Sequence, residues 1–195
     1  MADRRFSHAI AEGDGISVIA AVEDPDSARA AEEQRAEALV VRADPAAVRD
    51  ATTLPILWRG GVPLERAAEI ADAVILVFDA FAEEDGRLEA LHAQALGLGL
   101  DCAVEVRDEQ QLVRALERVD PEILLLSPAA ASADETPLER VLGLLAAVPA
   151  GKLAIADLQV TTADEVHELE RAGVDAVIVH SPDLSPLVGG PPPEV

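Results

Sequence analysis

Short apolar runs alternate with amphipathic segments along the chain, and residues 151–180 show the pattern most clearly. Leu153–Ala156 and Val174–Val179 are apolar, as in strands that are buried on both faces. Between them, Thr162 and Glu165 have the spacing of a capping box, which marks the start of a helix. A strand that returns parallel to its predecessor through a helix is a βαβ unit, so this stretch predicts one such unit.

The same pattern predicts strands and helices over most of the chain. The predicted strands are Ile16–Val22, Ala38–Val41, Leu54–Trp58, Ala73–Phe78, Leu100–Val106, Glu122–Leu126, Leu153–Ala156 and Val174–Val179. Helices are predicted within Asp3–Glu12, from Pro25 to near Ala36, from Pro45 behind the cap Asp44, from Pro63, around Leu88–Leu96, from Asp108 to Val119, from Pro137, and from Thr162 to Gly173. A last helix of one or two turns is predicted around Leu184–Val188. We expect Ala68, Leu96 and Ala172 to lie on the buried helix faces.

Eight strands alternating with helices, in units of roughly 20 to 25 residues, favour a single (β/α)8 TIM barrel. An open doubly wound sheet is the alternative. Against it, the first strand is followed by Glu23–Asp26 and not by a glycine-rich phosphate loop. We therefore expect one barrel domain over residues 1–188, a Gly/Pro-rich tail over 189–195, no cofactor, and functional groups at the carboxyl ends of the strands.

Composition narrows the range of partners. The net charge of −22 opposes binding to nucleic acid or to an anionic membrane, so we expect neither. No apolar run approaches the roughly 18 residues of a membrane span, and Met1–Ile10 lacks the apolar block of a signal peptide, so a cytoplasmic location is expected.

The only cysteine, Cys102, lies in an apolar strand and is interpreted as a packed side chain.

Four segments carry a family resemblance: SVIAAVE at Ser17–Glu23, LPILWRGG at Leu54–Gly61, AVEVRDEQQLVRAL at Ala103–Leu116, and Thr161–Val179. Across roughly residues 16–180 the chain resembles the indole-3-glycerol-phosphate synthase family of tryptophan biosynthesis. The resemblance implies a TIM barrel, here a compact and truncated one with a shortened loop after the first strand. It also implies a reaction that closes an indole ring on a phosphorylated anthranilate sugar, with loss of carbon dioxide and water.

The residues that the resemblance would assign to this chemistry are largely replaced. Glu23 and Arg59 stand at the positions of the two lysines that follow the first and third strands of the family. Glu105 retains the glutamate of the fifth strand, and Asp157 stands at the position of the glutamate after the seventh. The asparagine after the sixth strand is replaced by Ser127 or Pro128. Arginine holds its proton to above about pH 12, so Arg59 is a poor general acid. The only lysine, Lys152, precedes the seventh strand and is expected at the opposite end of the barrel.

The phosphate-holding positions differ as well. Leu158 and Gln159 replace a serine and a glycine after the seventh strand, and His180 and Ser181 stand where the family has glycine. Small residues there let backbone N–H groups approach a phosphate, so these larger side chains disfavour the family's phosphate site.

The strand ends therefore supply the candidate site. The catalytic candidates are Glu105, Asp157 and Arg59, and the ligand-binding candidates are Arg42, Asp79, Arg107, Ser127, Gln159, His180 and Ser181. Three interpretations stay open. Glu105 is a structural partner of Arg59 or Arg107; the three arginines bind a phosphate or carboxylate; or Asp79, Glu105, Asp157 and His180 hold a divalent metal. We expect no metal, because strand-end carboxylates often cap the following helix.

The predicted function is a degenerate family member that has lost the parent reaction and takes a small phosphorylated or carboxylated metabolite. One alternative is an active synthase, or a related sugar-phosphate lyase or isomerase, that uses Glu105, Asp157 and Arg59; if active, it is a carbon–carbon lyase. Another is a non-catalytic scaffold or regulatory protein with a protein partner or a second copy of itself. That alternative expects Trp58, Leu158 and His180 to fill the barrel mouth.

Overall fold

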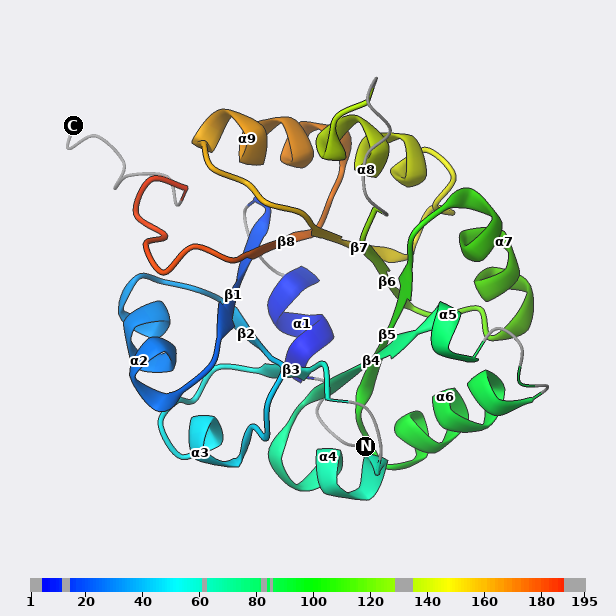
Figure 1. Cartoon of the computed structure of the whole chain (residues 1–195), viewed down its shortest axis with the longest axis horizontal. Helices are drawn as coiled ribbons and strands as arrows, with labels where there is room; N and C mark the ends of the chain where they lie inside the picture. The colour runs from blue at the N-terminus through cyan, green and yellow to red at the C-terminus, as the bar shows by residue number, and fades with distance from the viewer. Residues whose placement is uncertain are drawn as a thin grey trace.

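A computed structural model describes residues 5–11, 15–60, 63–81, 84, 86–128 and 135–187. Eight parallel strands pair in sequence order, and β8 pairs with β1 to close the barrel (Figure 1). The strands are β1 (Ser17–Val22), β2 (Ala38–Val41), β3 (Ile56–Trp58), β4 (Ala73–Val77), β5 (Asp101–Val106), β6 (Ile123–Leu126), β7 (Leu153–Asp157) and β8 (Ala176–Val179). The predicted TIM barrel is confirmed, and closure excludes the open sheet.

The helices of the described residues fall into two groups. Those from α2 onward surround the barrel, whereas α1 lies inside the ring (Figure 1). They are α1 (Arg5–Ala11), α2 (Pro25–Glu33), α3 (Ala46–Arg49), α4 (Leu64–Ile70), α5 (Phe78–Phe81), α6 (Arg87–Gly97), α7 (Glu109–Arg118), α8 (Pro137–Leu145) and α9 (Ala163–Ala172). Within the described ranges, none of them combines the length and apolarity needed to span a bilayer.

Helix α1 closes the amino-terminal end of the barrel. Phe6 and Ile10 are buried and belong to the cluster of inward-facing strand side chains. The backbone N–H of Ser7 donates to Asp101 Oδ2 at 2.8 Å, and Asp101 is the first residue of β5. Because α1 covers this end, the carboxyl ends of the strands form the open mouth.

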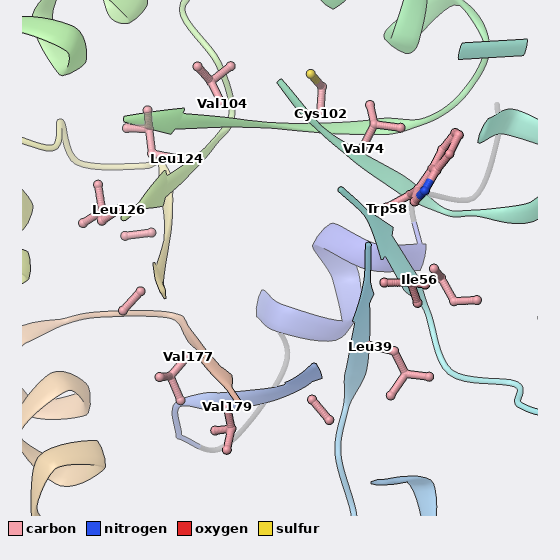
Figure 2. Close-up of a cluster of buried hydrophobic side chains, with 14 of the residues drawn as sticks. Leu39, Ile56, Trp58, Val74, Cys102, Val104, Leu124, Leu126, Val177 and Val179 are labelled. Atoms are coloured by element: carbon pink, nitrogen blue, oxygen red, sulfur yellow. The ribbon is translucent and has the colours of Figure 1, made fainter. Parts of the chain in front are cut away.

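The main hydrophobic core lies between the strands and the outer helices. Figure 2 shows side chains such as Leu39, Val104 and Val177 directed outward from the strands, away from the central α1. They are mostly leucine, valine and alanine, as expected of a core nearly devoid of aromatic residues. Alternate strand residues face the barrel interior, where Ile19, Leu57 and other apolar side chains fill the centre.

Capping signals place the helices as predicted. Thr162 and Glu165 form a capping box at α9, and Thr136 and Glu139 form another at α8. At α2 the carboxylate of Asp24 accepts the backbone N–H of Ser27 at 2.8 Å. Because β1 ends at Val22 and α2 begins at Pro25, the loop after β1 is as short as the sequence predicted.

Three predicted inward positions are wrong. Ala68, Leu96 and Ala172 are exposed, and Leu96 retains 41% of its surface. A helix that covers a sheet buries a stripe roughly 100° wide, and these residues lie at its edge or beyond it. Helix α4 buries Leu64, Ala67 and Ile70 instead.

Several boundaries also differ from prediction. Phe78, assigned to a strand, begins the short unpredicted helix α5. Helix α2 ends at Glu33, because Arg35 adopts a left-handed conformation with φ 65° and stops it before Ala36. Strand β3 starts at Ile56, after Pro55, which has no N–H to donate.

The predicted last helix of one or two turns after β8 is a single turn in the described residues. The N–H of Leu187 donates to Leu184 O at 2.9 Å and closes this turn. Val188 and the predicted 189–195 tail lie outside the described residues.

Candidate functional site

A pocket of about 720 Å³ opens at the carboxyl end of the barrel. Its walls combine charged side chains from several strand ends with a few apolar ones. They are Arg42, Arg59, Val77, Glu105, Arg107, Ser127, Asp157, Leu158, Gln159 and His180. All of these residues except Val77 and Leu158 are site candidates predicted from the sequence. Barrel closure thus brings together side chains that are more than 100 residues apart in the chain.

An arginine clamped by two carboxylates forms the centre of this pocket. Arg59 Nη2 donates to Glu105 Oε2 at 3.0 Å and to Asp157 Oδ2 at 2.6 Å. The three side chains are only 12%, 4% and 8% exposed, respectively. They come from the ends of β3, β5 and β7, and alternate strands of a TIM barrel contribute to the same interior layer. All three predicted catalytic candidates are therefore in direct contact.

His180 extends the cluster on the far side of Asp157. Its Nε2–H donates to Asp157 Oδ1 at 2.7 Å, so both carboxylate oxygens are engaged. Burial raises the pKa of Asp157, but the His180 hydrogen bond and the charge of Arg59 outweigh burial and hold this pKa below its usual value. Asp157 is therefore an ionised acceptor near neutral pH and a weak base.

Arg107 completes a second arm of the ion network. It lies 3.3 Å from Glu105 Oε1 and 3.5 Å from Asp79 Oδ2, and Gln111 Nε2 donates to Asp79 Oδ1 at 2.7 Å. Glu105 therefore pairs with both Arg59 and Arg107, which is the structural interpretation left open by the sequence. Gln111 lies in the helix predicted from Asp108 to Val119, but its contact with Asp79 was not predicted from the sequence.

A second hollow of about 760 Å³ adjoins the first and shares Arg42, Arg59 and His180 with it. It lies against α2, the ends of β1 and β2, and the turn that follows β8. Its lining is Ala20, Ala21, Val22, Glu23, Asp24, Ser27, Ala30, Ala31, Val40, Arg42, Ala43, Arg59, His180, Ser181, Pro182 and Leu184. Ser181 therefore lies in this hollow, where its Oγ–H donates to Asp183 O at 3.0 Å.

Trp58 does not fill the mouth as the scaffold alternative expected. Its indole belongs to the outer core, and Nε1–H donates to Ala43 O at 2.9 Å. A Cβ on Gly60 would lie 2.0 Å from Trp58 Nε1, so only glycine fits there. Leu158 and His180 line the pocket but leave it open.

The metal interpretation gains no support from the geometry. In the described part of the chain, no group of three or more His, Cys, Asp or Glu side chains is placed to hold a metal ion. The carboxylates of Asp79, Glu105 and Asp157 face arginines instead.

Two further predictions concern residues away from the mouth. Lys152 Nζ lies 2.7 Å from Asp120 Oδ1, just before β7, so the only lysine is at the amino-terminal end as predicted.

Cys102 is buried in the outer core, which confirms that it is a packed side chain. Its burial raises the pKa of the thiol to about 12.

Comparison with solved structures supports the same architecture. The N-acetylmannosamine-6-phosphate 2-epimerase from Clostridium perfringens superposes with a TM-score of 0.69, at 12% identity and 87% coverage of each chain. The thiamine phosphate pyrophosphorylase from Pyrococcus furiosus superposes with a TM-score of 0.64, at 18% identity, covering 85% of this chain and 86% of the other. At these identities the likeness concerns the fold alone.

Sequence comparison identifies the family. Indole-3-glycerol phosphate synthase from Geobacillus thermodenitrificans is 28% identical over 137 residues, which are 68% of this chain and 52% of the relative. The enzyme of that name from Shouchella clausii is 29% identical over 139 residues, 69% of this chain and 54% of the relative. The chain spans about half the length of these curated relatives. Because the family model for indole-3-glycerol phosphate synthase matches residues 62–182, more than half of the chain, this protein belongs to that family.

Proposed function

We propose that this family member does not catalyse the ring closure and instead binds a small carboxylated or phosphorylated metabolite at the barrel mouth. The observation that carries the proposal is the clamp on Arg59. This guanidinium stands where the family resemblance implies a lysine that donates a proton, and its Nη2 donates to both Glu105 and Asp157.

The clamp opposes acid–base work by each of its members. A guanidinium does not release its proton near neutral pH, and both carboxylates already accept hydrogen bonds from the guanidinium of Arg59. Glu105 accepts from Arg59 on one oxygen and faces Arg107 with the other, so its carboxylate is already engaged. The only ammonium side chain, on Lys152, is held at the other end of the barrel by Asp120.

The charge of the central pocket supports an anionic ligand. Three arginines and two carboxylates line it, a local excess of one positive charge in a chain whose net charge is −22. Arg59 and Arg107 are paired, whereas the exposed side chain of Arg42 forms no hydrogen bond or ion pair with any other described residue. Arg42 is thus available for a carboxylate or phosphate oxygen.

A second candidate function is a lyase or isomerase that uses Glu105, Asp157 and Arg59. It is favoured by the direct contact of these side chains at an open pocket. The regulatory or scaffold alternative expected a filled mouth, and a pocket of about 720 Å³ gives it no support.

Two measurements test the proposal. The purified protein and E105Q are assayed for conversion of the phosphorylated anthranilate sugar to indole glycerol phosphate. We expect no turnover by either protein. Turnover by the wild type that falls in E105Q would refute the loss of the reaction and establish the lyase alternative.

Anion binding is tested separately by thermal shift with acetate, sugar phosphates and inorganic phosphate. At least one of these anions should raise the melting temperature of the wild type and of R87M, but not that of R42M. Arg87 is a matched control, because it is an exposed arginine at the start of α6 that lines neither hollow. Equal stabilisation of R42M would refute an anion site at Arg42.

A further inference from the structure

The second hollow places a carboxylate and a guanidinium side by side without pairing them. Glu23 and Arg42 both line it, directly after Val22 and Val41, which are register partners in β1 and β2. Adjacent strands lie about 4.8 Å apart, so the two backbones are close at this point. Yet neither side chain forms an ion pair or hydrogen bond with another described residue.

The remaining charged groups of this hollow are already engaged. Asp24 Oδ1 accepts from Ser27 N at 2.8 Å and from Ser27 Oγ at 2.9 Å, and so caps α2 with its own charge. Arg59 is held by its two carboxylates, and His180 donates to Asp157. In the described lining, Glu23 and Arg42 are therefore the charges left for a ligand.

The apolar part of the lining is small and aliphatic. It is formed by Ala20 and Ala21, Ala30 and Ala31, Val22, Val40, Ala43, Pro182 and Leu184. The turn that carries Pro182 and Leu184 is fixed to α2, because Gln34 donates to Pro182 O at 3.2 Å and accepts from Leu184 N at 2.6 Å. Apart from the imidazole of His180, which is bonded to Asp157, the described lining contains no aromatic ring, so the aliphatic part suits a branched aliphatic group better than a flat ring.

We propose that this hollow binds a small aliphatic α-amino acid as its zwitterion. The ligand carboxylate lies at Arg42, its ammonium group at Glu23, and its side chain against the alanine and valine wall. Two carboxylates and two arginines line the hollow and cancel, which suits a ligand with no net charge better than a phosphate dianion. The inference rests on the carboxylate site at Arg42 proposed above and adds the ammonium and the aliphatic group.

The experiment measures the affinities of four probes by calorimetry. L-Valine carries all three features, isovalerate lacks the ammonium, isobutylamine lacks the carboxylate, and glycine lacks the aliphatic group. We expect valine to bind at least about tenfold more tightly than each of the other three, a difference of about 1.4 kcal/mol.

Three variants assign the features to residues. E23Q should lower the affinity for valine to that for isovalerate, and R42M should lower it to that for isobutylamine. A30L extends a side chain from α2 into the hollow and should weaken valine at least fivefold while leaving glycine unchanged. E33Q is the matched control, because Glu33 is an exposed carboxylate on the same helix, outside the hollow, and it should bind as the wild type does.

The outcomes separate this inference from the proposed function. Isovalerate binding as tightly as valine, with both lost in R42M, would overturn the amino-acid inference and leave the carboxylate site standing. An unchanged preference for valine in E23Q would also overturn the inference. If no carboxylate probe binds in an Arg42-dependent manner, both the inference and the proposed site are refuted.

Discussion

Replacing Arg59 with methionine should destabilise the barrel strongly, because it removes the cation between two buried carboxylates. The side chains of Glu105 and Asp157 are 4% and 8% exposed, and methionine supplies similar length without charge. Breaking a buried ion pair by removing one partner typically costs 3–5 kcal/mol. Since His180 and Arg107 still contact the two carboxylates, we expect the lower end, a loss of about 3 kcal/mol at about pH 7.

Urea unfolding followed by circular dichroism measures this loss. With a urea dependence of about 2 kcal/mol per molar, the midpoint should fall by about 1.5 M. R29M is the matched control, since Arg29 pairs with Asp26 on the exposed face of α2, and it should change stability by less than about 1 kcal/mol. The double variant R59M/D157N should regain part of the loss, because it removes one of the two stranded charges.

The loss should also depend on pH, with a sign that follows from Asp157. In the wild type its pKa is lowered, so its contribution is present above the usual value of 3.8 and is lost as the pH falls through the folded pKa. In R59M the charge of Arg59 no longer opposes the effect of burial, so the pKa of Asp157 is higher than in the wild type. As the pH falls, Asp157 is therefore protonated in the variant before it is protonated in the wild type, and this removes the unpaired buried charge. The stability gap should therefore narrow from about pH 7 to about pH 4. A gap below 1 kcal/mol at neutral pH, or one that does not change with pH, would refute the reasoning.

Two other predictions test the packing. F6A should lose about 3 kcal/mol of unfolding free energy, because Phe6 of α1 is fully buried in the inner core. L96A, at an exposed position, is its control. Equal urea midpoints for the two variants would contradict the closure of the amino-terminal end by α1. Cys102 should resist a thiol-specific reagent at about pH 8 in the folded protein, because burial raises its pKa to about 12, and should react fully in denaturant. Rapid labelling of the folded protein, followed by absorbance, would show that the thiol is accessible.

Local signals in the sequence identified most of the fold. Capping pairs such as Thr162 with Glu165, and apolar runs such as Ala38–Val41, depend on neighbouring residues alone, so their positions could be predicted without tertiary information. The alternation of such elements also favoured the barrel over an open sheet. The family resemblance then located the strand ends at which the site residues stand.

What local signals could not determine is which residues contact each other across the molecule. Leu96 was predicted to be buried because it is apolar and at helical spacing, but the width of the contact with the sheet leaves it exposed. Helix α1 has the pattern of any short amphipathic helix, and only the closed barrel provides the opening that Phe6 and Ile10 fill. The turn at Leu184 likewise depends on a distant partner, Gln34.

The predicted strands place carboxylates and guanidinium groups at the mouth of this barrel and its only lysine at the other end, because each position follows from its place in a strand. Which of these charges pair is visible only in the folded barrel, where Glu105 and Asp157 share Arg59. There the side chains of Glu23 and Arg42 line the second hollow without a partner among the described residues. Pairing depends on the distance between side chains of different strands. Those distances are set by barrel closure and packing, not by the local spacing of residues in the chain.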